Sequence, residues 1–261
     1  ALLRRAAGPG VADTARNQTP DKMAAMLHRR IRKTMGEDFD LAPFTPPYKP
    51  WEQRLCLVPD DDLFAALKSG KAEVVTGHIA AFEAGGVRLT DGTFLPADIV
   101  VTATGLKLAV AGKIAVSLDG RPVNFSEHFY YKGCMFSNLP NLAVVFGYLN
   151  ASWTLRADIN SDYVCRVLNA MRARGVDVAV PVLAADHGLE EDDIFDFSSG
   201  YIQRGKAIMP KNAVAYPWRL NQEYRLDRKR MANDPIEDGI LALRRHGADM
   251  KQVDRALEAA E

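Results

Sequence analysis

The chain has 261 residues, and its 33 basic side chains balance its 33 acidic ones, so the formal net charge is zero. That length suits one large domain or two modest ones of about 100–200 residues each, and a hydrophobic share of 48% is that of an ordinary folded protein. Zero net charge argues against a nucleic-acid-binding protein, which normally has a basic excess. The apolar runs are strand-sized, so we expect no membrane span, which needs about 20 apolar residues. The three cysteines form no CxxC pair, which fits a reducing, cytoplasmic location.

The first third of the chain predicts two helices separated by a proline-rich loop. Thr19-Pro20 supplies an N-cap and a first helical position. An apolar residue then recurs every four positions up to a stop at Gly36, namely Met23, Leu27, Ile31 and Met35. Five prolines between Pro43 and Pro59 remove backbone donors and fix φ, so this segment is expected to be an extended loop. Residues 60–67 follow as a short helix closed by Gly70.

Residues 72–104 predict a succession of strands. The expected ranges are 72–76, 78–82, 87–90, 93–95 and 97–103, with turns at Gly85-Gly86 and Asp91-Gly92. Asp98–Thr102 is apolar nearly throughout, as in a central parallel strand. It ends in Ala103-Thr104-Gly105, at the carboxyl end of a buried strand, where α/β sheets place their ligands.

A second buried strand, Leu142–Gly147, leads directly into a long helix that ends near Gly175. The apolar stripe of this helix consists of Leu155, Ile159, Tyr163, Val167 and Met171. Strands and helices of this kind predict an α/β fold, but a phosphate-binding glycine loop is missing. The nearest candidate, Gly8-Pro9-Gly10, follows no apolar strand, and its proline lacks a backbone N–H. Together with a first residue that is not Met, this leads us to expect an incomplete chain.

Three strings occur in a fixed order along the chain: Trp51–Cys56, Ala103–Gly105 and Gly147–Thr154. Together they resemble the carboxyl-terminal half of class B flavoprotein monooxygenases, and more narrowly the Baeyer–Villiger monooxygenases of the ethionamide-activating type. The strings Phe197–Arg204 and Pro217–Gln222 strengthen the narrower match. The resemblance covers most of the chain.

This resemblance implies the carboxyl-terminal parts of two Rossmann-like dinucleotide-binding domains. Residues 1–103 would belong to the NADPH-binding domain with its proline-rich active-site loop, and residues 104–261 to the FAD-binding domain plus a tail. The implied cofactors are FAD and NADPH, and the implied activity is O2-dependent oxygenation of a ketone, or of a sulfur or nitrogen atom, through a flavin peroxide. The implied partners are a small-molecule substrate and the missing amino-terminal half. Since both glycine-rich loops are absent, the isolated chain is expected to be inactive and to lack tight FAD binding.

The resemblance also assigns roles to individual residues. Arg54 takes the place of the family's active-site arginine, whose permanent charge stabilises a peroxide anion and an oxyanion, although Gln53 stands where many relatives carry Lys. The remaining assignments are Thr104 and Gly105 at the crossover between the two domains, Gly147, Tyr148, Asn150 and Ala151 against the flavin, and Trp153 and Trp218 in a substrate or nicotinamide pocket. Structural roles stay open for several of these: an ion pair for Arg54, a local cap for Asn150 and core packing for the tryptophans.

Two other functions remain open at this point. One is a two-domain pyridine-nucleotide flavin reductase, which shares the Ala-Thr-Gly crossover. The other is a non-catalytic α/β remnant without a cofactor. Cys56, Cys134 and Cys165 are expected to be buried packing residues, and the scattered histidines have no metal-ligand spacing, so no metal site is expected.

Overall fold

A computed structural model describes residues 20–50, 52–53, 59–149, 151–193 and 198–247. The chain divides into two compact units, Ala1–Leu106 and Lys107–Glu261, which we treat separately. The division falls three residues after the predicted boundary between residues 103 and 104. Which cofactor each unit serves stays a prediction.

The described part of the first unit contains two α-helices, one on either side of the proline-rich segment. Helix α3 spans Pro20–Met35, and a 3-10 turn, Ala42–Phe44, precedes another at Pro59–Asp61 and helix α4, Asp62–Lys68. The Phe44 ring lies 5.7 Å from the Phe39 ring and 5.8 Å from the Phe64 ring, measured between centroids. Both predicted helices are therefore confirmed, and aromatic packing connects the loop to α4.

A three-stranded antiparallel meander completes the first unit. Its strands are β1 (Ile79–Glu83), β2 (Gly86–Leu89) and β3 (Phe94–Pro96), in the order β1-β2-β3. The turn predicted at Asp91-Gly92 joins β2 to β3, and the Asp91 carboxylate accepts a hydrogen bond from the Thr93 N–H. Three of the five strands expected in this region are thus confirmed.

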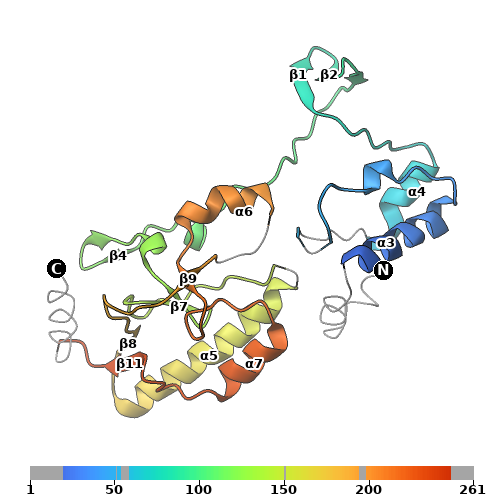
Figure 1. Cartoon of the computed structure of the whole chain (residues 1–261). Helices are drawn as coiled ribbons and strands as arrows, with labels where there is room; N and C mark the ends of the chain where they lie inside the picture. The colour runs from blue at the N-terminus through green and yellow to red at the C-terminus, as the bar shows by residue number, and fades with distance from the viewer. Residues whose placement is uncertain (1–19, 51, 54–58, 150, 194–197, 248–261) are drawn as a thin grey trace. The chain divides into compact units, whose positions relative to one another are not determined.

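The other expected strands are wrong for this structure. Residues 72–78 and 97–106 are extended on either side of the meander without strand pairing, and Figure 1 draws both without arrows. Ile99 and Val101 are 82% and 84% exposed, the opposite of a central buried strand. Residues 142–147 likewise form no strand in the second unit. The physical reason is that a parallel strand needs a neighbouring strand reached by a crossover connection, and the described residues supply none to these segments.

The residues of the second unit that the structure describes form three α-helices and short antiparallel strand pairs. The pairs are β4 (Ser117–Leu118) with β5 (Arg121–Pro122), β6 (Tyr130–Tyr131) with β7 (Met135–Phe136), β8 (Val178–Pro181) with β11 (Leu241–Arg244), and β9 (Glu191–Asp192) with β10 (Asn212–Ala213). The helices are α5 (Trp153–Arg174), α6 (Gly200–Gly205) and α7 (Tyr224–Asn233). The fold is therefore mixed helix and strand, as an α/β class requires, but the described residues contain no doubly wound parallel sheet.

Helix α5 organises the core of the second unit. Its predicted stripe faces inward: Ile159, Tyr163, Val167 and Met171 are buried, and Leu155 packs at the edge of the same cluster. Helix α7 lies beside α5 (Figure 1), and Arg166 of α5 donates to the Met231 and Asp234 carbonyls near the end of α7. The long helix ends at Gly175, as predicted.

Two cysteines of this unit differ in their surroundings. Cys134 is buried, and burial raises the pKa of its thiol to about 12. Cys165, by contrast, is exposed on the outer face of α5, so the expectation that it is buried is wrong. Its position two residues from both Tyr163 and Val167 puts it off the inward stripe. Cys56 lies outside the described residues.

Helices of the described part are too short or too polar to cross a bilayer. Residues 177–193 are rich in Asp and Glu, and residues 203–230 are rich in Lys and Arg. The two segments meet in two solvent-exposed ion pairs, Lys206–Asp193 and Lys211–Glu191. Exposed pairs of this kind contribute about 0–1 kcal/mol each.

Candidate functional site

The turn that leads into α5 is tightly packed around a glycine. A Cβ added to Gly147 would lie 2.2 Å from Cγ of Trp153, so only glycine fits beneath this ring. The Trp153 ring also packs on Phe146, with centroids 5.2 Å apart, and remains 46% exposed. The sequence Gly147-Tyr148-Leu149 therefore brings the backbone directly under an aromatic ring at the start of a helix.

Tyr148 anchors this turn to a buried ionic cluster. Its hydroxyl donates to Oδ2 of Asp227, at 2.8 Å, and the guanidinium carbon of Arg156 lies 4.2 Å from the centroid of its ring. Arg156 Nη2 is 2.8 Å from the same carboxylate oxygen and also donates to the Asn221 carbonyl. The Arg156 side chain is 1% exposed. The three side chains, which we call the Arg156 cluster, join the start of α5 to the first turns of α7.

The absence of a side chain at Gly133 leaves room for Arg156. Gly133 has φ +62°, and an added Cβ there would lie 2.8 Å from Arg156 Nη1 and from Leu220. Asn160, one turn further along α5, donates to the Gly133 carbonyl at 2.9 Å. The Leu149 N–H donates to Oε1 of Gln222, also at 2.9 Å. These contacts hold the turn and the first part of α5 against two segments that are distant in sequence, one at Gly133 and the other at residues 220–222.

Burial governs ionisation in the Arg156 cluster. Desolvation raises the pKa of the Asp227 carboxyl, and Arg156 and the Tyr148 hydroxyl oppose this rise without cancelling it. Desolvation also raises the pKa of Tyr148, so its hydroxyl stays protonated and donates to the carboxylate. The cluster therefore depends on Arg156 to compensate a carboxylate removed from water.

The start of α5 is open to a ligand. Ser152 is the N-cap, but its side chain makes no capping hydrogen bond and instead lies 2.7 Å from the Thr154 hydroxyl oxygen. The first N–H groups of a helix have no acceptor within the helix. Ala151 is half-buried, and the residues from Ser152 to Thr154 are exposed. These N–H groups can thus donate to a carbonyl edge or an anion.

A second buried network lies further along the inward face of α5, at Tyr163. The Lys132 ammonium is 3.0 Å from Oδ2 of Asp238, and the Tyr131 hydroxyl donates to the same oxygen at 2.6 Å. The Tyr163 hydroxyl donates in turn to the Tyr131 oxygen. Burial alone would raise the pKa of Asp238, but hydrogen bonds from Tyr131, the Leu241 N–H and Lys132 outweigh it and lower the pKa.

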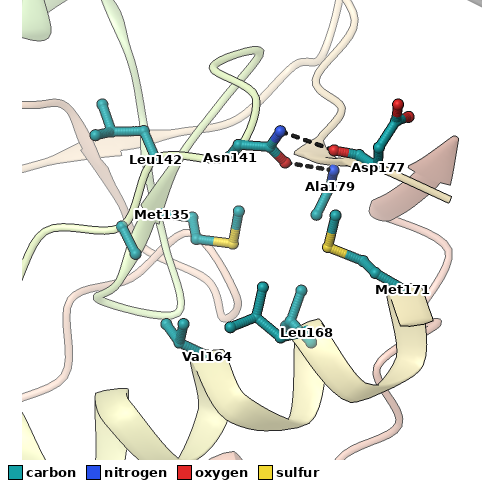
Figure 2. Close-up of a pocket in the computed structure, with 10 residues that line it drawn as sticks. Met135, Asn141, Leu142, Val164, Leu168, Met171, Asp177 and Ala179 are labelled. Carbon is teal, nitrogen blue, oxygen red and sulfur yellow. Dashed lines mark hydrogen bonds between the residues drawn. The ribbon is translucent and has the colours of Figure 1, made fainter. Parts of the chain in front are cut away.

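An apolar cavity of about 320 Å³ opens between α5 and residues 135–143. Figure 2 shows Met135 and Met171 facing each other across it, with Val164 and Leu168 of α5 forming its base. The polar residues at its rim already bond to each other, since the Asn141 side chain donates to the Asp177 carbonyl and accepts from the Ala179 N–H. The cavity therefore favours apolar groups.

The structure brings together part of the predicted site. Gly147, Tyr148, Ala151 and Trp153 lie together at the start of α5. Their predicted contacts with a flavin or a substrate stay a prediction. Trp218 is instead 4% exposed, with its ring edge-on to Tyr131 at 5.4 Å. This position is the core packing that we left open for it.

The other predicted residues lie elsewhere. Thr104 and Gly105 belong to the first unit, where both are exposed. Gly105 has φ +103°, a conformation that favours glycine. Arg54 and Asn150 lie outside the described residues. Among the residues that are described, acidic, histidine and cysteine side chains form no cluster of three suited to a metal ion.

Sequence reasoning missed Arg156, Asp227 and Lys132, the buried charged residues beside this site. The sequence does indicate a buried position for Arg156. It precedes Asn160 by four residues and Tyr163 by seven, so it lies on the inward face of α5. A charged residue on a buried face requires a partner. Its partner, Asp227, is 71 residues further along the chain, and no local pattern identifies it.

Comparison with known proteins identifies relatives of the chain. The chain is 42% identical over 230 residues to a protein of Acinetobacter sp named "Probable FAD-binding monooxygenase AlmA". It is 44% identical over 220 residues to the FAD-containing monooxygenase EthA of Mycobacterium tuberculosis, and 40% identical over 230 residues to that of Mycolicibacterium smegmatis. The chain is homologous to the carboxyl-terminal half of these FAD-containing monooxygenases.

The matches cover most of the chain but only part of the relatives. They span 87%, 84% and 88% of the chain, and 46%, 45% and 46% of AlmA and the two EthA proteins respectively. The chain thus spans about half the length of the monooxygenases that it matches. No family model and no solved structure matches it.

Proposed function

We propose that the chain supplies the carboxyl-terminal half of an FAD- and NADPH-dependent monooxygenase. The assembled enzyme would use O2 to oxygenate a ketone, in a Baeyer–Villiger reaction, or a sulfur or nitrogen atom of a small molecule. The relatives are all named FAD-containing or FAD-binding monooxygenases, which favours this activity over a flavin reductase. A cytoplasmic location belongs to the same proposal.

One observation supports the proposal: the start of α5 is exposed and has no side-chain cap, and it would accept the polar edge of a flavin. The backbone at Gly147 passes beneath Trp153, and the helix start beside it is uncapped. The N–H groups of Ser152 and Trp153 would donate to the carbonyl edge of the isoalloxazine ring. Tyr148 would hold the turn in place through Asp227, rather than touch the cofactor, because it is 1% exposed.

Bound FAD would supply the redox chemistry with NADPH and O2, and the protein would supply binding, orientation and charge. The half-exposed Trp153 ring would cover one side of the reaction space. The Thr104-Gly105 crossover would let backbone approach a cofactor closely. Arg54 would provide the fixed positive charge for developing negative charge on oxygen, since an arginine stays protonated at any working pH.

The test is reconstitution of the whole enzyme. The chain is joined to the amino-terminal half of the Acinetobacter relative, and three quantities are measured: flavin absorbance, NADPH consumption under air, and product formed per NADPH from a ketone and from a sulfide. We expect bound flavin and coupled product. A folded fusion that binds flavin but yields only H2O2 with every substrate would contradict the monooxygenase assignment, whereas one without flavin would contradict the cofactor site.

Arg54→Ala in this fusion separates catalysis from assembly. Flavin reduction by NADPH should persist, because hydride transfer depends on cofactor stacking rather than on this charge. Oxygenation should fall by about 10²–10³, the typical effect of losing one preorganised donor to an oxyanion. Arg54→Lys should recover only part of the loss, because an ammonium lacks the planar donor fork. Unchanged coupling in Arg54→Ala would make the residue structural.

A further inference from the structure

Tyrosine hydroxyls of the second unit donate to aspartate carboxylates at three places. The pairs are Tyr131 with Asp238, Tyr148 with Asp227, and Tyr216 with Asp234. Packing alone does not require a carboxylate, because a buried tyrosine hydroxyl needs only some acceptor, and Tyr130 uses the Val144 carbonyl. A carboxylate is also a base, so it can take the hydroxyl proton rather than only share it. These tyrosines can therefore lose a proton without contact with water.

Two of these pairs gather around one buried ammonium group. Nζ of Lys132 lies 5.3, 5.4 and 5.9 Å from the ring centroids of Tyr131, Tyr163 and Tyr216 respectively. The Tyr163 hydroxyl donates to the Tyr131 oxygen at 3.4 Å. Tyr131 and Tyr163 are fully buried, whereas Tyr216 is half-buried. The three rings thus connect the core to a ring that solvent reaches.

Trp218 extends this group further into the core. Its ring is 4% exposed and lies edge-on to the Tyr131 ring, with 5.4 Å between the centroids. The Lys132 N–H donates to the Pro217 carbonyl at 2.7 Å, which holds residues 216–218 against the end of β6. Indole and phenol rings lose one electron more readily than the other aromatic side chains do. Oxidisable rings therefore follow one another from the buried Trp218 to the half-buried Tyr216.

We propose that Trp218, Tyr131, Tyr163 and Tyr216 form a relay that carries an oxidising equivalent out of the core of the second unit. The oxidant is a one-electron oxidant of the hydroxyl-radical class, which one-electron reduction of H2O2 produces, and the final reductant is ascorbate or a thiol in solution. The relay uses only side chains of this chain and needs no flavin. It can therefore fail or succeed independently of the proposed monooxygenase activity.

The first transfer couples the electron to a proton. The oxidant removes one electron from the Trp218 ring. Tyr131 returns an electron to that ring and passes its hydroxyl proton to Asp238, which leaves intact Trp218, a neutral Tyr131 radical and a protonated carboxyl. Although burial opposes them, hydrogen bonds lower the pKa of Asp238, so its carboxylate is ionised at neutral pH and can accept the proton. The Lys132 ammonium disfavours a second positive charge on the adjoining ring, so the proton leaves with the electron.

The later transfers return every proton. Tyr163 gives its hydroxyl hydrogen atom to the Tyr131 oxygen along their hydrogen bond, which moves the radical to Tyr163. Tyr216 returns an electron to Tyr163 and releases its hydroxyl proton to Asp234. The proton held by Asp238 passes back through Tyr131 to the Tyr163 oxygen. The reductant in solution donates a hydrogen atom to Tyr216, and Asp234, which is half-buried, releases its proton to water.

Laser photoionisation starts the relay at one known residue of the full chain. In a Trp51→Phe, Trp153→Phe background, Trp218 is the single tryptophan. An ultraviolet pulse at the long-wavelength edge of indole absorption removes an electron from it, and transient absorption follows the tryptophan and tyrosyl radicals. We expect the tyrosyl radical to form as the tryptophan radical decays, at a rate that does not depend on chain concentration and that is lower in D2O than in H2O. Circular dichroism checks that each variant folds.

Substitutions that remove one hydroxyl identify the members of the relay. Tyr131→Phe should slow the decay of the tryptophan radical by about tenfold or more, which corresponds to a barrier higher by about 1.4 kcal/mol. Tyr130→Phe is the matched control, because Tyr130 is also buried in β6 but donates to a carbonyl, which does not take up a proton. It should change the decay by about twofold at most. Tyr216→Phe should leave the decay unchanged and should slow the quenching of the tyrosyl radical by added ascorbate by about tenfold.

Four results would overturn the proposal. The first is that no tyrosyl radical follows the Trp218 radical in a folded chain. The second is that Tyr130→Phe and Tyr131→Phe slow the decay equally, because the carboxylate would then have no special role. The third is a transfer rate that rises with chain concentration or that is equal in H2O and D2O. The fourth is quenching by ascorbate that Tyr216→Phe leaves unchanged.

Discussion

Removal of Arg156 should destabilise the second unit far more than removal of a surface arginine on the same helix. Arg156 is 1% exposed and lies 2.8 Å from an Asp227 oxygen whose carboxylate is 6% exposed. In Arg156→Met, the carboxylate would keep the Tyr148 hydroxyl as a partner but lose its countercharge. Removing one partner of a buried pair costs about 3–5 kcal/mol. With a urea m-value of about 2 kcal/mol/M, the midpoint should fall by about 1.5–2.5 M.

The chain contains its own matched control. Arg174, at the end of α5, pairs with Glu237, and the two side chains are 43% and 57% exposed. Because water already solvates both groups, Arg174→Met should cost about 0–1 kcal/mol. The two variants change the same residue type on the same helix, so helix propensity cancels between them.

A double substitution tests the reason for the loss. Arg156→Met with Asp227→Leu removes both buried charges, and replacement of a buried pair by apolar side chains is often close to neutral. The Tyr148 hydroxyl would lose its acceptor, at a cost of about 1–3 kcal/mol. The double variant should therefore be more stable than Arg156→Met. The assay is urea unfolding followed by tryptophan fluorescence and by circular dichroism. Equal losses in Arg156→Met and Arg174→Met, or additive losses in the double variant, would refute the reasoning.

Three further predictions follow from the same structure. Gly147→Ala should destabilise the second unit by about 1–3 kcal/mol because its Cβ would overlap the Trp153 ring. The loss should largely disappear in a Trp153→Ala background. Thermal unfolding of the unchanged chain, the two single variants and the double variant measures this. The pKa of Asp238 is lowered in the folded state. Its contribution to stability is therefore present at neutral pH and is lost as the pH falls below about 4, the pKa of an Asp in the unfolded chain. Asp238→Asn should lower the free energy of unfolding at pH 7 and should reduce the difference in that free energy between urea titrations at pH 7 and pH 3. The 261-residue chain alone should not bind FAD tightly, and calorimetry that finds micromolar affinity would contradict this.

The sequence alone determined the local elements and the family. The four-residue apolar repeat located α3, and the stripe from Leu155 to Met171 located α5 with its inward face, because helical periodicity is encoded in neighbouring residues. Turn chemistry at Asp91-Gly92 gave the hairpin of the meander in the same way. The ordered strings around Gly147 gave the resemblance that the relatives confirm.

Tertiary structure decided which residues stabilise the site. The partner of Arg156 is Asp227 of α7, and the partner of Lys132 is Asp238, which precedes β11. Both carboxylates are far from their partners in sequence, and folding brings them together. Tertiary structure also decided against the strands expected at residues 97–103 and 142–147. Their pattern is that of buried strands, but a strand forms only where another strand accepts its hydrogen bonds. Sequence therefore encodes the preference of a segment, whereas the presence of its partner decides whether that preference is realised.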